Sequence, residues 1–178
     1  MAALKEKPIF FETTSVLAIL AGTKTQTRRA FCLPEGQASP PAGAALKGWR
    51  PLYQPGDILW VRETWGVGIQ LAGGIIYKAD YVGRRAPLAE GFKWRPSMIM
   101  PRCAARIFLR VTDARVERLQ DISEYDAIAE GLADATHYTP RENIARFAEF
   151  WDGFNVKRGY GWETDPWVWA YTFERMRP

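Results

Sequence analysis

Apolar and polar positions alternate along this chain in a way that predicts short strands separated by a few helices. A first strand is expected at 8–12, followed by an apolar helix at 14–21 that ends at Gly22. The alternation after Gly22 indicates an extended segment, in which successive side chains point to opposite faces. Thr23, Thr25 and Thr27 would then share one face, and Lys24, Gln26 and Arg28 the other.

The rest of the chain continues this pattern. Further strands are predicted at 58–65, 75–81, 105–117 and 167–173, and helices at 123–130 and 139–155. The first of these helices begins with a Ser123-x-x-Asp126 capping pattern, and the second carries Pro140 in its first turn. Because prolines bracket Trp94–Arg102, that connection should be ordered but irregular.

These elements predict an α+β fold, best described as a mixed β-barrel or half-barrel flanked by a few helices. At 178 residues, the chain should form one domain spanning 1–178. The stretch from Pro34 to Gly48 is rich in Pro, Gly and Ala, so we expect an inserted loop at about 30–50.

Composition narrows the possible partners. The chain is 47% apolar and 25% charged, but it contains eight Trp, some of which should line a surface pocket. A formal charge of +4 favours an acidic partner such as nucleic acid. No apolar run approaches the roughly 18 residues of a membrane span, and the N-terminus lacks a signal-peptide core, so a cytoplasmic location without membrane contact is expected.

Several site chemistries are excluded by residue counts. His137 is the single histidine, which rules out His-based triads and multi-histidine metal sites. Cys32 and Cys103 lie far apart and indicate neither a disulfide framework nor a thiolate site. Glycine-rich phosphate loops are absent, and no cofactor or metal is expected. Catalysis would have to rest on carboxylates, lysine, hydroxyls or arginine.

The segment from Gly22 to Arg29 is the first candidate site. It brings three cations (Lys24, Arg28 and Arg29) together with the hydroxyls of Thr23, Thr25 and Thr27. Such a segment suits a phosphate-bearing or other polar ligand. The alternative is a solvated turn and edge strand, where Thr and Lys are common.

Aromatic residues interleaved with charges form two further candidates. Trp60, Arg62, Glu63 and Trp65 could stack a base and bind its edge, or they could be core tryptophans beside a surface ion pair. Trp94 lies among Lys93, Arg95 and Arg102, which suits a single-strand-binding surface but is also common on basic rims. Glu130, at the end of a predicted helix, would by itself be read as a solvated carboxylate.

The order of these pieces resembles the ASCH family of the PUA-like superfamily, particularly its longer phage and prophage members. The resemblance covers most of the chain apart from the 30–50 loop and parts of 66–104. It rests on Gly22-x-Lys24-Thr25-x-Thr27-Arg28, Tyr53-x-Pro55-Gly56-Asp57, Val111-Thr112, Leu119-x-x-Ile122-Ser123, Glu130-Gly131 and the final aromatic strand.

The resemblance implies a PUA-like barrel whose cleft binds RNA or a modified nucleobase. Some small bacterial ASCH proteins remove the acetyl group of N4-acetylcytidine, others cleave RNA, and others are thought only to bind nucleic acid. The active residues of the amidohydrolases correspond to Lys24, Thr27 and Glu130, so these three positions are the implied catalytic residues. Thr27 would be the nucleophile, Lys24 its base, and Glu130 the group that positions water or protonates the leaving amine.

We therefore expect a cleft around Lys24, Thr27, Arg28 and Glu130, with Trp60, Arg62, Glu63 and Trp65 as its walls. The expected partner is RNA, single-stranded nucleic acid or a modified nucleoside, and the expected activity is that of an amidohydrolase or a ribonuclease. Two alternatives stay open. The protein could be a non-catalytic module that reads RNA, DNA or a modified base, or an accessory protein that binds a protein partner through the 30–50 loop.

Overall fold

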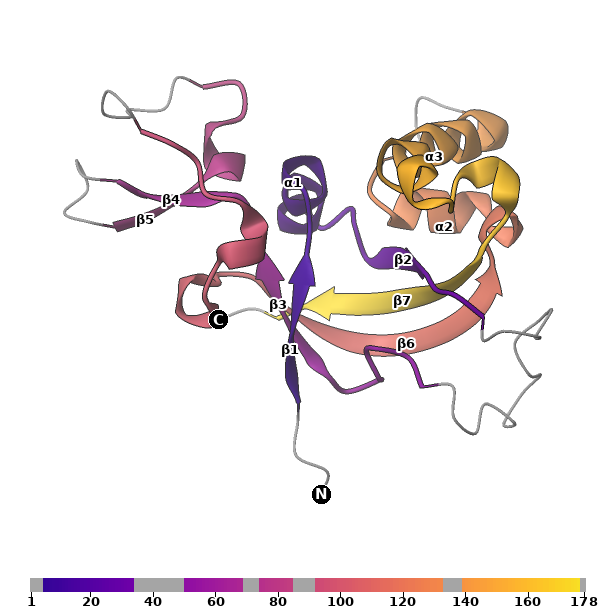
Figure 1. Ribbon diagram of the computed structural model, residues 1–178, viewed down its shortest axis with the longest axis horizontal. Coiled ribbons are helices and arrows are strands. Elements are labelled where there is room, and N and C mark those ends of the chain that lie inside the picture. The colour runs from indigo at the N-terminus through magenta and orange to yellow at the C-terminus, as the bar shows by residue number, and fades with distance from the viewer. Residues whose placement is uncertain (1–4, 34–49, 69–73, 85–91, 133–138, 177–178) are drawn as a thin grey trace.

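The computed structural model describes residues 5–33, 50–68, 74–84, 92–132 and 139–176 (Figure 1). The predicted loop at 34–48 and His137 lie outside these residues. The fold is α+β. Three α-helices, α1 (Thr13–Ala21), α2 (Glu124–Ala129) and α3 (Pro140–Asn155), lie close to their predicted positions.

Seven strands are arranged in two sheets within the described residues. The larger sheet has the order β1-β3-β6-β7-β2, in which β1 and β3 run parallel and the other pairs antiparallel. The smaller sheet is the hairpin β4-β5. The strands are β1 (Glu6–Phe10), β2 (Gln26–Ala30), β3 (Ile58–Arg62), β4 (Trp65–Gly68), β5 (Gly74–Tyr77), β6 (Phe108–Arg118) and β7 (Trp167–Arg175).

The strand predicted at 58–65 is broken in two because the chain changes partners. β3 pairs with β6 as far as Trp60 and with β1 as far as Arg62, whereas Trp65 pairs with Arg95 through reciprocal backbone hydrogen bonds of 3.2 and 2.8 Å. The Trp94–Arg102 connection is ordered and irregular, as its prolines predicted, and contains the short 3₁₀ helix Ser97–Ile99.

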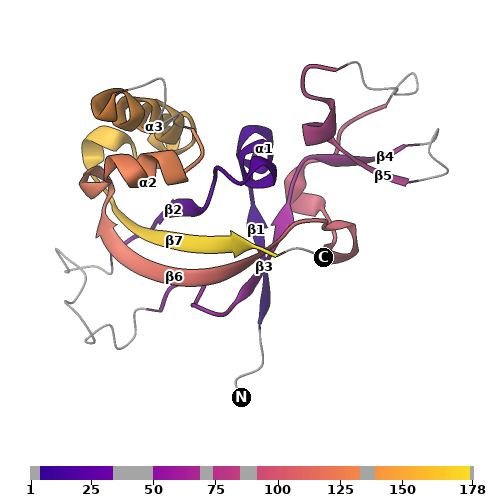
Figure 2. The same cartoon turned by 180° about the vertical axis from the view of Figure 1, so that it is seen from behind.

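The predicted barrel is wrong in one respect, because the described strands form an open sheet. β1 and β2 stand at its two edges and do not pair with each other. The chain between these strands forms α1, and α1 buries Val16 and Ile19 against the inner face of the sheet (Figures 1 and 2). A helix therefore occupies the position where a barrel would need a closing strand pair.

The two faces of the sheet are covered differently. On the inner face, α1 packs on a core that includes Leu59, Val61 and Tyr171. On the opposite, outer face, Val168 packs with Phe147 and Trp151 of α3, so α2 and α3 cover the β2-β7 end of the sheet. Because neighbouring positions of β7 face opposite cores, the sheet separates two environments.

The end of α2 docks on the free edge of β2. The N–H of Thr25 donates to the carbonyl of Ala129 at 2.8 Å, and Lys24 and Glu130 form an isolated antiparallel bridge. Gly131 follows with φ +80°, and a Cβ placed there would lie 2.7 Å from the Cβ atoms of both Ala18 and Lys24. Glycine is therefore required for this close approach.

We predict that Gly131→Ala destabilises the fold more than Gly22→Ala. Both glycines have φ +80°, but a Cβ at Gly22 meets nothing within 4 Å. The Gly22 variant isolates the cost of the backbone conformation, about 1–2 kcal/mol, whereas the Gly131 variant adds overpacking of about 1–3 kcal/mol. Urea unfolding of both variants measures the difference, and equal losses would contradict the close-packing argument.

Candidate functional site

A buried ion pair joins the two predicted site residues that are most distant in sequence. Lys24 Nζ lies 2.7 Å from Glu130 Oε2 and also donates to the Glu130 carbonyl at 2.8 Å, although the residues are 106 positions apart. The side chains are only 1% and 3% exposed. Lys24 Nζ also lies 5.6 Å from the centre of the Phe11 ring. The amino group is thus held between a carboxylate and an aromatic face.

Local sequence signals place both partners. Gly22 ends α1 in a left-handed conformation, which turns the chain back so that the N–H of Lys24 donates to Ala18. Ser123 and Asp126 form the predicted capping box of α2, and Glu130 is the C-cap of that helix. The helix caps therefore determine where the lysine and the glutamate meet.

Arg28 fixes the other side of the Glu130 carboxylate. Its Nη1 lies 3.1 Å from Glu130 Oε1, and its Nε donates to Glu117 Oε1 at 2.8 Å. Asp126 is a third carboxylate near this guanidinium, with an N–O distance of 3.6 Å. The Arg28 side chain is 0% exposed, so it holds the site together and does not face solvent.

The sequence reasoning missed the carboxylates that surround Arg28. Arg115 completes this network by binding Glu117 and Asp126, each at 2.8 Å. The signal that could have found them is the charge alternation Asp113-Ala-Arg115-Val-Glu117, which puts three charges on one face of β6, the strand that pairs with β7.

Burial sets the electrostatics of Lys24. Desolvation lowers the pKa of its amino group from the usual 10.5, and the attraction of Glu130 opposes this shift. A lysine with a lowered pKa can release its proton more easily than a surface lysine and can act as a base. The environment of Lys24 is therefore suited to proton transfer.

The other residues of the motif fall in different environments. β2 begins at Gln26, so the predicted row of three threonines does not form a common surface: Thr25 is exposed and Thr27 is buried. Thr27 lies on the face of β2 that carries Arg29, opposite Arg28. Among the described residues, no hydrogen bond joins the Thr27 hydroxyl to Lys24 or Glu130.

Arg29 is the exposed cation of the motif. Its guanidinium lies 5.4 Å from the centre of the Phe11 ring, the ring that Lys24 also contacts, and it donates to the carbonyl of Phe10 at 2.7 Å. The surrounding protein desolvates the group and lowers its pKa even though the side chain is open to solvent.

Trp60 and Arg62 are placed together but away from Lys24. They share the outer face of β3, where the Arg62 guanidinium lies 4.5 Å from the centre of the Trp60 ring. The intervening Val61 belongs to the inner core, as does the Phe11 ring beside Lys24. No contact among the described residues brings this pair to the Lys24–Glu130 centre.

Glu63 forms a separate ion cluster. Its carboxylate is bound by Arg106 at 2.9 and 3.0 Å, and Arg106 also binds Asp80 at 2.8 Å. Burial raises the pKa of Glu63, and the hydrogen bonds and charge of Arg106 oppose that rise. Since Asp80 follows β5, this cluster ties the β4-β5 hairpin to the main sheet.

The last three predicted residues surround that hairpin and the start of β6. Trp65 is buried beneath the Arg95 guanidinium, which lies 5.0 Å from the ring centre. Trp94 packs on Phe92 with a ring-centre distance of 5.1 Å. Arg102 is exposed and bound by Glu6 at 2.7 and 3.0 Å. The predicted site residues are thus distributed over several separate groups and do not surround one centre.

Neither a metal site nor a membrane span is evident in the described ranges. No cluster of three His, Cys, Asp or Glu residues that could hold a metal ion occurs there. Within the same ranges, no helix is both long and apolar enough to cross a membrane.

The solved structures similar to this chain include two bacterial proteins. One is a DUF984-family protein from Enterococcus faecalis (TM-score 0.48, 14% identity, covering 99% of this chain and 78% of that one). The other is an ASCH domain from Lactobacillus crispatus (TM-score 0.47, 13% identity, covering 96% and 79%). No protein-family model and no curated protein matches the chain.

We expect Arg28→Ala to destabilise the protein far more than Arg115→Ala. Removing Arg28 leaves buried carboxylates without their main partner, which typically costs about 3–5 kcal/mol. The Arg115 side chain is 34% exposed, so its loss should cost only about 1 kcal/mol. Urea unfolding near neutral pH makes the comparison, and similar losses would show that burial does not set the strength of this network.

Lys24 should make stability depend on pH in a defined direction. Its folded-state pKa lies below the unfolded value of 10.5, so between these values the unfolded chain binds more protons. The free energy of unfolding should therefore rise with pH in that window, by at most about 1.4 kcal/mol per pH unit. Urea unfolding at increasing pH, up to about pH 9.5, should show this rise in the wild type but not in Lys24→Met.

The pH range of this experiment should end below the ordinary tyrosine pKa, because Tyr171 also affects stability at higher pH. Burial raises the pKa of Tyr171 from 10.0 to about 12, and a raised tyrosine pKa lowers stability as pH increases through that interval. Measurements below the ordinary tyrosine pKa keep the two effects apart. The same pH dependence in wild type and Lys24→Met would contradict the assignment.

Proposed function

We propose that this protein binds RNA or a modified nucleobase and hydrolyses an exocyclic amide of that base at the Lys24–Glu130 centre. The observation that carries the proposal is the buried Lys24 amino group, with its lowered pKa, 2.7 Å from the Glu130 carboxylate. Buried titratable groups paired in this way are frequent at catalytic sites.

The chemistry follows from the two groups. A neutral Lys24 amine accepts the proton of a nucleophile, which is Thr27 or water, as that nucleophile attacks the amide carbonyl. Collapse of the tetrahedral intermediate breaks the C–N bond, and the amine leaves with a proton delivered through Glu130. With water as the final acceptor of the acyl group, the products are a carboxylate and the free base.

Arg29 and Arg28 take different parts in this proposal. Arg29 is exposed beside the Phe11 ring that Lys24 contacts, so it can bind a phosphate or a carbonyl oxygen of the ligand. Arg28 is enclosed by carboxylates and holds Glu130 in place. The exposed hydroxyl of Thr25 adds a further polar contact. The net charge of +4 suits an anionic partner.

A non-catalytic binding module is the second candidate. Both oxygens of the Glu130 carboxylate already have partners, Oε1 in Arg28 and Oε2 in Lys24. A carboxylate held in this way can serve as a rigid support for a ligand-binding edge without donating or accepting protons. Ribonuclease activity would use the same residues, with Lys24 stabilising the phosphorane-like state and Glu130 acting as base.

Hydrolysis of N4-acetylcytidine and cleavage of single-stranded RNA should be measured for wild type, Lys24→Met and Glu130→Gln. Loss of the base or of the proton donor should each lower the rate by about 100-fold or more. Lys7→Met is the matched control, because Lys7 also pairs with a carboxylate, Asp57, at 2.6 Å. We expect this control to retain the wild-type rate.

The outcomes separate the candidates. Turnover that is lost in Lys24→Met and Glu130→Gln but kept in Lys7→Met supports the enzyme. Undiminished turnover in both site variants would overturn the site assignment. No turnover in wild type, with RNA binding that weakens with salt and with Arg29→Ala, would support the binding module.

A further inference from the structure

Part of the outer face of the main sheet carries aromatic and cationic side chains in register. Phe10 of β1 lies beside Arg62 of β3, and Pro8, Trp60 and Phe108 form the next row across β1, β3 and β6. At the other end of this face, Val168 packs against Phe147 and Trp151 of α3, and Figure 2 shows α2 and α3 together at that end of the sheet. We call Pro8, Phe10, Trp60, Arg62, Phe108 and Arg110 the outer-face patch.

The centre of the outer-face patch is a stacked arrangement. The Arg62 guanidinium lies 5.2 Å from the centre of the Phe10 ring and 4.5 Å from that of the buried Trp60 ring. Phe10 is 41% exposed. A planar guanidinium held on an aromatic ring, next to an exposed ring, offers two flat surfaces on which nucleobases stack.

Arg62 is also available for an anion. Its Nη1 donates to the carbonyl of Met98 at 3.0 Å, and none of the ion pairs of the described residues includes Arg62, so no carboxylate among them neutralises its charge. Arg102, which lies 4.3 Å from the centre of the Phe108 ring, is by contrast neutralised by Glu6. Arg62 is therefore better placed for a phosphate than Arg102.

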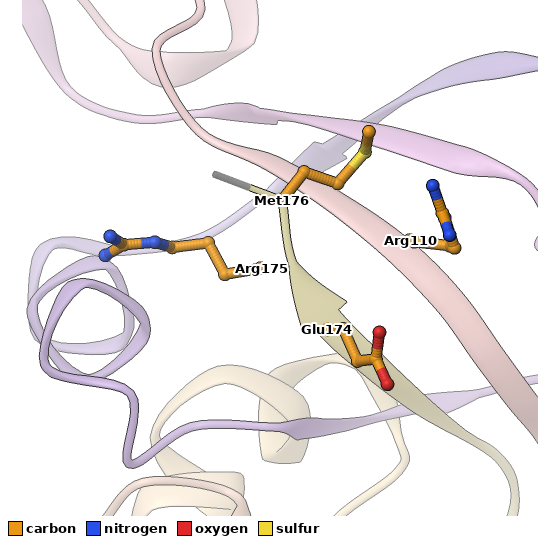
Figure 3. A pocket seen from close by; sticks show the side chains of 4 residues that line it. All are labelled: Arg110, Glu174, Arg175 and Met176. Atoms are coloured by element: carbon orange, nitrogen blue, oxygen red, sulfur yellow. The ribbon is translucent and has the colours of Figure 1, made fainter. Parts of the chain in front are cut away.

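A recess continues the patch along β6 and β7. It has a volume of about 220 Å³ and is lined by Arg110, Glu174, Arg175 and Met176. Arg110 and Glu174 are opposite each other in the register of these strands, whereas Arg175 points away towards α1 and donates to Leu20 (Figure 3). The Glu174 carboxylate disfavours a phosphate next to Arg110, so an anionic backbone would pass over Arg62.

We propose that the outer-face patch binds single-stranded nucleic acid, separately from the Lys24–Glu130 centre. Bases stack on Phe10 and on the Arg62 guanidinium, and Arg62 neutralises a backbone phosphate. A single strand is required because the base faces of a duplex are already stacked on one another. The patch has no part in the hydrolytic chemistry proposed above, so each proposal can fail without the other.

Fluorescence anisotropy with a labelled uridine oligonucleotide tests the patch. Phe10→Ala should weaken binding by roughly five- to 150-fold, which corresponds to the loss of one stacked base. Arg62→Lys keeps the charge but loses the planar surface, and it should also weaken binding. Arg62→Ala should in addition lower the slope of log affinity against log salt by about 0.7. Phe154→Ala is the control, since this ring is 54% exposed on α3.

Circular dichroism reports whether each variant is folded. Hydrolysis of free N4-acetylcytidine reports whether the Lys24–Glu130 centre is affected. Binding that falls in the Phe10 and Arg62 variants but not in Phe154→Ala supports the patch. Oligonucleotide binding that is equal in all variants would overturn it. So would the absence of any binding by wild type, and the face would then be a candidate surface for a protein partner.

Discussion

The ion pairs of Glu130 are the interaction on which the rest of the site depends. Charges this deeply buried lose their hydration, and only close, well-directed partners offset the free energy of desolvation. Glu130 has such partners on both carboxylate oxygens, in Lys24 and Arg28. Because these partners come from the segment around β2, the end of α2 is fixed against a strand that precedes it by about a hundred residues.

The open edge of β2 makes this arrangement possible. In a closed barrel the backbone of β2 would pair with another strand along its full length. Here the edge instead accepts the last turn of α2, through Thr25 and the Lys24–Glu130 bridge. The departure from the predicted barrel and the formation of the site are therefore one structural feature. α1 fills the gap between the two sheet edges, so the inner core stays closed.

Sequence patterns predicted the elements better than the contacts between them. Periodicity and caps placed the three helices within a residue or two, since these signals are local. The pairing of Lys24 with Glu130 came from the family resemblance, because no local signal connects residues that far apart. Alternation alone puts Arg115 and Glu117 on one face of β6, but it does not say that this face meets Arg28, which lies two strands away in the sheet.

The same limitation explains why the predicted cleft walls fall into separate groups. Alternation correctly put Trp60 and Arg62 on one face of a strand, but it does not say which face meets Lys24. Glu63 and Trp65 lie where the chain leaves the main sheet for the β4-β5 hairpin. The strand breaks between Arg62 and Trp65 because the two parts pair with different segments, and those segments lie elsewhere in the sequence.

Arg28 and Arg29 are adjacent and identical, but alternation along β2 places their side chains in different environments. Their side chains point to opposite faces of β2, so one is enclosed by Glu117, Asp126 and Glu130 while the other stays open to water beside Phe11. The enclosed arginine has no remaining surface to offer a ligand. Of the two, only Arg29 is exposed to solvent.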